Sequence, residues 1–65
     1  MSGSGSSIDA TDVQAKIDDD LQQQASDAGI DVEQVVANQI EENGEYGVKT
    51  IVRFTESAIK RQIEA

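Results

Sequence analysis

The absence of cysteine and histidine constrains this chain more than any other feature of its sequence. A fold of only 65 residues lies near the lower size limit and usually needs a disulfide, a bound metal or a partner chain. Without cysteine or histidine, neither a disulfide nor a zinc site can form. We therefore expect one small domain over residues 8–65 that gains stability by association, as a homo-oligomer or as a subunit bound to another protein.

Residues 1–7 contain only methionine, serine and glycine, a composition typical of flexible linkers. They lack the charged and apolar regions of a secretory signal, and no apolar run in the chain approaches the roughly 20 residues of a membrane span. We expect a flexible Gly/Ser tail, either native or a cloning remnant, on a cytoplasmic or virion-associated protein.

The first half of the domain is patterned as two helices joined by a tight turn. Thr11 is a suitable N-cap with Gln14 at capping-box spacing, and Gly29 suits the left-handed position that ends a helix. Asp31 then caps a second helix, which Asn43 and the glycine after it would end. Apolar residues at helical spacing predict two buried stripes: Val13, Ile17, Leu21, Ala25 and Ala28, followed by Val32, Val35, Val36 and Ile40.

Residues 48–55 change the period, because β-branched and aromatic residues alternate between two faces. They predict a single β-strand without a mate in the chain, which must pair across an oligomer or with a partner. Thr55 or Ser57 would cap a short C-terminal helix. The expected fold class is therefore α+β: a helix-turn-helix-like α-hairpin, one strand and a short helix. A second interpretation stays open, in which residues 46–63 form one amphipathic helix.

Two segments resemble DNA-binding motifs. Residues 25–35 resemble the turn of a helix-turn-helix, with a small residue before Gly29 and Val35 as the buried anchor after it. Residues 49–63 resemble the opening of a ribbon-helix-helix protein, with Lys49, Ile51 and Arg53 facing outward from a strand. The second resemblance implies a dimer that inserts its strand into the major groove.

The charge distribution argues against general binding of nucleic acid. The chain has a net charge of −8, and residues 1–45 hold eleven carboxylates against Lys16 alone. Residues 46–65, by contrast, carry four basic residues and two acidic ones. An acidic surface repels phosphate over two-thirds of the chain, and we expect it to influence which protein partners bind and how fast.

Little in the sequence is suited to catalysis or metal binding. Histidine and cysteine are the commonest general bases, nucleophiles and soft-metal ligands, and both are missing. The acidic run that begins at Asp18 does not match a calcium loop, because its sixth and twelfth positions are Gln23 and Gly29 rather than glycine and glutamate.

The favoured hypothesis is a non-enzymatic acidic interaction subunit that acts as an adaptor, regulator or inhibitor. Its partner would be a protein or a second copy, rather than a membrane or a small-molecule substrate, and no cofactor or metal is expected. Two alternatives stay open: a dimeric, antitoxin-like DNA-binding repressor that uses the basic strand, and a structural or virion assembly component. The residues expected to contact the partner are Val48, Lys49, Ile51, Arg53 and Thr55 on the strand, and Asp18, Asp19 and Asp20 on the acidic helical face.

Overall fold

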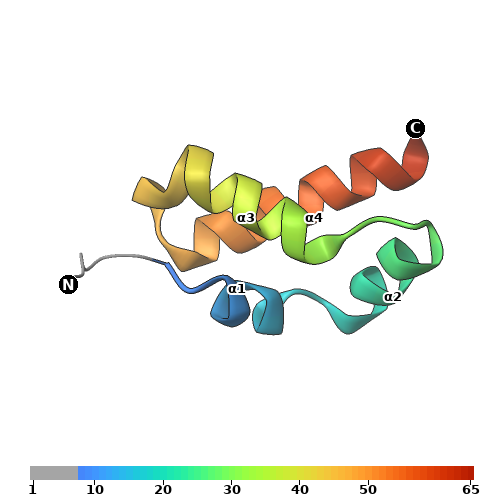
Figure 1. Ribbon diagram of the computed structural model, residues 1–65, viewed down its shortest axis with the longest axis horizontal. Coiled ribbons are helices and arrows are strands. Elements are labelled where there is room, and N and C mark those ends of the chain that lie inside the picture. Colours follow the sequence, from blue (N-terminus) through green and yellow to red (C-terminus); the bar gives the residue numbers. More distant parts are fainter. Residues whose placement is uncertain (1–7) are drawn as a thin grey trace.

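The computed structural model describes residues 8–65, and the predicted tail at 1–7 lies outside them. In Figure 1, the two longest helices lie side by side, and the two short helices pack across the same side of that pair. No strand is present in the described part of the chain. The helical segments are α1 (Ala10–Lys16), α2 (Asp19–Asp27), α3 (Val32–Asn43), the 3₁₀ turn η1 (Gly44–Tyr46) and α4 (Val48–Glu64).

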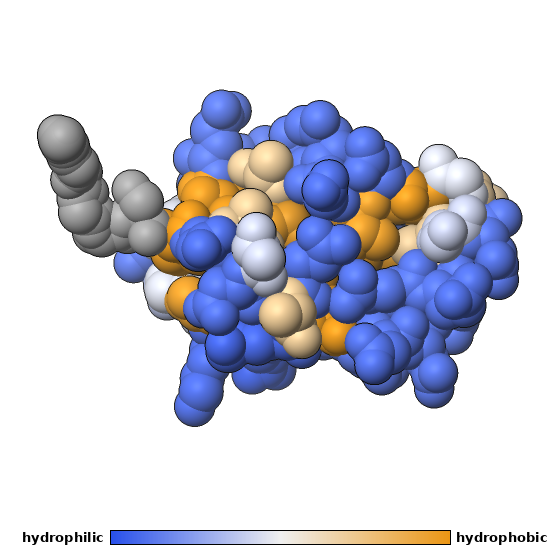
Figure 2. All heavy atoms as spheres, turned by 60° about the horizontal axis from the view of Figure 1, so that its bottom comes forward, coloured by the Kyte–Doolittle hydropathy of each residue, from blue (hydrophilic) through white to orange (hydrophobic). Residues whose placement is uncertain are grey.

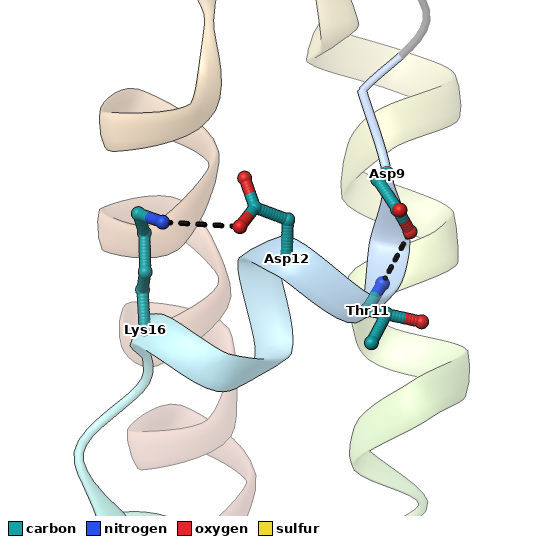
Figure 3. Close-up of polar contacts among 4 residues, drawn as sticks. All are labelled: Asp9, Thr11, Asp12 and Lys16. Atoms are coloured by element: carbon teal, nitrogen blue, oxygen red, sulfur yellow. Dashed lines mark hydrogen bonds and ion pairs between the residues drawn. The ribbon is translucent and has the colours of Figure 1, made fainter.

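The first predicted helix is divided into α1 and α2, with the break at Ile17 and Asp18. The N-cap of α1 is Asp9 rather than Thr11, and its carboxylate accepts the Thr11 backbone N–H at 2.9 Å (Figure 3). Three consecutive aspartates compete with helical hydrogen bonding inside a helix but are favourable at its N-terminus. The acidic run therefore starts a new helix instead of continuing the first.

One side chain from α2 satisfies the end of α1. The Gln22 amide nitrogen donates to the backbone carbonyls of Gln14 at 2.9 Å and Ile17 at 3.2 Å. The Gln14 carbonyl lies in the last turn of α1, where it also accepts the Ile17 N–H, and the Ile17 carbonyl lies at the C-cap, where a helix lacks intrahelical donors. The predicted apolar stripe continues across the break, since Val13, Ile17, Leu21 and Ala25 are all buried, but its last predicted member, Ala28, is the C-cap of α2 and is exposed.

The turn between α2 and α3 agrees with the prediction. Gly29 has a φ of 79°, and the Ile30 N–H donates to the Ala25 carbonyl at 2.8 Å while the Gly29 N–H donates to Ser26 at 3.0 Å. This pair of bonds is a Schellman motif, which requires a left-handed residue. Asp31 caps α3 by accepting the backbone N–H of Gln34.

Residues 48–55 form the first half of α4, so the predicted strand and the α+β fold class are wrong. At helical spacing, Ile51, Thr55 and Ile59 fall on one face, and all three are fully buried. Burying an isoleucine contributes about 1.5–3 kcal/mol, whereas β-branched residues cost a helix only some tenths of a kcal/mol each. A helix also pairs its own backbone groups, which an unmated strand cannot do. The single amphipathic helix was the correct interpretation, and Thr55 lies inside that helix rather than capping it.

All four α-helices contribute to one core. Within residues 8–65, no helix is both long and apolar enough to cross a membrane. Figure 2 shows the side that carries α1 and α2, where hydrophilic residues dominate and apolar residues emerge only between them. The buried residues are Val13 from α1 and Ile17 at its C-cap, Leu21 and Ala25 from α2, Val32, Val35 and Val36 from α3, and Ile51, Thr55 and Ile59 from α4.

Candidate interaction surface

The helix redistributes the residues that were expected to contact a partner through a strand. Ile51 and Thr55 are 0% exposed and belong to the core, and Val48 is half-buried against that core. Only Lys49 and Arg53 of this set are exposed. Residues 48–55 therefore do not form a strand that could pair with a partner, and the DNA-binding mechanism that required this strand loses its basis.

Lys49 and Arg53 border an apolar depression at the seam between α1 and α4. It has a volume of about 320 Å³ and is lined by Lys16, Lys49, Val52 and Arg53, which together we call the basic hollow. The surface turned into it is carbon rather than nitrogen or oxygen, because the alkyl parts of long basic side chains can cover apolar surface while their charged ends stay in water. Three of the five basic residues in the chain thus surround one apolar floor.

Lys16 is held in place by its own helix. Its ammonium nitrogen lies 3.1 Å from the Asp12 carboxylate, one turn earlier in α1 (Figure 3). Both side chains are about half exposed, so water screens the pair and it orients Lys16 more than it stabilises the fold. Lys49 and Arg53 form no salt bridge within the described residues, which leaves their charges open to a ligand.

The acidic run contacts α4 at its first residue. Asp18, Asp19 and Asp20 are exposed at the start of α2, and the Asp18 backbone N–H donates to the Glu56 carboxylate at 3.2 Å. Glu56 lies one turn beyond Arg53 on α4. The Asp18–Glu56 bond fixes the start of the acidic run against α4, whereas Asp19 lines a separate depression with Thr11, Gln14, Ala15 and Gln22.

Sequence reasoning missed Lys16 and Val52 as members of this surface. A strand places Val52 on the face opposite Lys49 and Arg53, whereas a helix brings these residues together through i, i+3 and i, i+4 spacing. The alternative interpretation of residues 46–63 as one helix therefore already places Val52 beside Lys49 and Arg53. No sequence pattern joins Lys16 to it, because that contact depends on how α1 packs.

The remaining features of the surface limit its chemistry. α3, which occupies the place of a recognition helix after the Gly29 turn, exposes Glu33, Glu41 and Glu42 and carries no basic residue. Within residues 8–65, no group of three or more histidine, cysteine, aspartate or glutamate side chains is arranged to hold a metal ion.

No protein-family model, curated protein or solved structure matches this chain. The fold is that of a small helical protein, and three of the four residues that line the basic hollow belong to α4.

Proposed function

We propose that this chain is a non-enzymatic interaction subunit that binds an acidic protein segment at the basic hollow. The observation that carries the proposal is the gathering of Lys16, Lys49 and Arg53 around the exposed part of Val52. An apolar side chain from the partner fills the hollow, and carboxylates beside it on the partner meet the surrounding cations.

Local and overall charge act differently in this interaction. The chain carries a net charge of −8, which repels an acidic partner at long range. At physiological ionic strength, charges separated by more than about 8 Å are largely screened, so the cations at the hollow dominate at contact.

A titration with a designed peptide tests the proposal. The probe is a short helical peptide with one leucine flanked by glutamates on the same face, added to the ¹⁵N-labelled chain and followed by amide chemical shifts. We expect shifts centred on Lys16, Lys49, Val52 and Arg53, with binding that weakens as salt is raised. Peptides with alanine for the leucine, or glutamine for the glutamates, should each bind at least tenfold more weakly.

Charge reversal on the protein provides the matched control. Arg53→Glu should abolish binding of the peptide, whereas Lys60→Glu, which changes the net charge equally on the same helix but outside the hollow, should leave it within about twofold. Equal loss in both variants would mean that the peptide senses only overall charge. Absence of shifts with the original peptide at about 1 mM, where binding would be worth only about 4 kcal/mol, would refute the proposal.

A further inference from the structure

The only two aromatic residues of the chain are exposed and touch each other. Tyr46 is 57% exposed and Phe54 40%, and their rings meet edge to face with centroids 6.1 Å apart. Aromatic side chains bury more apolar surface than most other side chains, so burying both rings in the core would stabilise a monomer. Here the core is built from aliphatic residues, and both rings stay at the surface.

A shallow groove runs beside these rings between α3 and α4. It has a volume of about 270 Å³ and lies on the flank of α4 that faces α3, whereas the basic hollow lies on the flank that faces α1. Aromatic residues and arginine are enriched where protein interfaces are fully buried, and they often dominate binding energy. The groove is lined by Gln39, Asn43, Phe54, Ser57, Ala58 and Arg61.

The two ends of this surface carry opposite charges. Arg61 lines the groove toward the C-terminal end of α4, whereas the exposed Glu42 and Glu45 lie in the segment that leads into α4, with Glu45 directly before Tyr46. Phe54 lies near the middle, since a rise of 1.5 Å per residue puts it about 10 Å from Arg61 and about 9 Å from the start of α4. The layout is therefore positive at one end, aromatic in the centre and negative at the other end.

From this layout we propose that a second copy of the chain docks on this surface with its α4 reversed. In a two-fold arrangement every contact occurs twice, so Phe54 packs near its symmetry mate. Arg61 of each copy then meets the acidic end and the Tyr46 ring of the other, where a cation–π contact adds to the charge attraction. A purely acidic or purely basic ligand would match one end and oppose the other, whereas a reversed copy matches both.

A charge-swap experiment by sedimentation equilibrium tests this dimer. The wild-type chain should dimerise reversibly and weakly, because one small helical surface buries less than a standard interface. Arg61→Glu alone, and Glu42→Arg with Glu45→Arg, should each weaken dimerisation at least tenfold. Lys60→Glu changes the net charge as Arg61→Glu does but lies outside the groove, so it should change dimerisation less than threefold.

Mixing the two weakened variants gives the decisive result. In the mixed dimer, each glutamate at position 61 faces arginines and each Arg61 faces glutamates, so association should return to within threefold of wild type. A chain carrying all three substitutions should dimerise equally well. Position 61 lies roughly 20 Å along α4 from the end next to Glu45, so positions 61 and 45 do not meet within one chain.

Circular dichroism on each variant separates loss of association from loss of folding, and Phe54→Ala should weaken the dimer without unfolding the chain. A wild-type chain that stays monomeric at about 1 mM would overturn the proposal, and so would a mixture that fails to recover. Neither result bears on peptide binding at the basic hollow, which the dimer leaves open on the other flank of α4.

Discussion

Replacing Thr55 with valine should stabilise the protein. Thr55 is fully buried in the middle of α4, and its hydroxyl oxygen has no hydrogen-bond partner. Burying an unpaired hydroxyl costs about 1–3 kcal/mol in protein mutational data. Valine has the same branched shape and a similar helix propensity, so the change removes that cost without creating a cavity.

The expected gain is about 1–3 kcal/mol in the free energy of unfolding. For a domain of this size, each kcal/mol shifts the unfolding midpoint by roughly 4–8 °C, so the valine variant should melt at least about 4 °C higher. Thermal and urea unfolding followed by far-UV circular dichroism would measure both quantities. All samples need the same protein concentration, because self-association adds apparent stability.

Thr55→Ser is the matched control. It keeps the hydroxyl and removes the methyl group, so it should lower stability by roughly 1 kcal/mol. A valine variant that is no more stable than wild type would refute the reasoning. In that case the hydroxyl must find a partner in solution, and the backbone carbonyl one turn earlier in α4 is the nearest type of acceptor for such a bond.

Three further predictions concern the ends of the helices. Gly47→Ala should destabilise the fold by about 1–3 kcal/mol, because the Gly47 φ of 92° and ψ of 168° lie in a region that essentially only glycine adopts. Gly44→Ala is the control: Gly44 has a right-handed helical φ of −57°, and an added Cβ would lie 3.9 Å from the nearest atom. This control should be neutral or slightly stabilising in the same melting assay. Asp31→Ala should cost roughly 0.5–2 kcal/mol through loss of a cap, and Asp18→Ala should cost less because the Asp18 side chain makes no cap hydrogen bond; equal losses in urea unfolding would contradict the assigned caps. Gln22→Leu should leave the last carbonyls of α1 without their side-chain donor and increase amide exchange in α1 more than in α4, whereas uniform exchange across both helices would show that this side chain does not hold α1.

The sequence predicted the features that depend on neighbouring residues. The Gly29 turn, the Asp31 cap and the buried stripe from Val13 to Ala25 were all recognisable, because each is encoded within a few positions of the chain. The break between α1 and α2 was missed because the acidic run was placed inside one helix, although aspartates favour a helix start. The junction is also held by side-chain contacts of Gln22 and Glu56 with backbone groups. Neither contact has a signature in a single sequence.

The wrong strand at residues 48–55 has a specific cause. Local β propensity and a helical apolar period were both present, and tertiary burial decided between them. The buried positions Ile51, Thr55 and Ile59 lie four residues apart. Only a helix places all three on the face that packs against α1 and α3, so their burial stabilises the helix and not the strand. The error carried over to the candidate interaction surface, because Lys49 and Arg53 were expected to contact a partner while Val52, between them in the sequence, was assigned to the opposite face.

The shortness of α1 and α2 links the basic hollow to the folding of the N-terminal arm. Helices of 7 and 9 residues are too short to persist alone in water, where roughly 12–15 residues are marginal. The arm is therefore helical only while it is docked on α3 and α4. Because Lys16 comes from the arm and the other three residues come from α4, the hollow is complete only in the docked state. Any ligand that bridges this seam must shift the arm toward docking, and by reciprocity whatever tightens docking must raise affinity for that ligand.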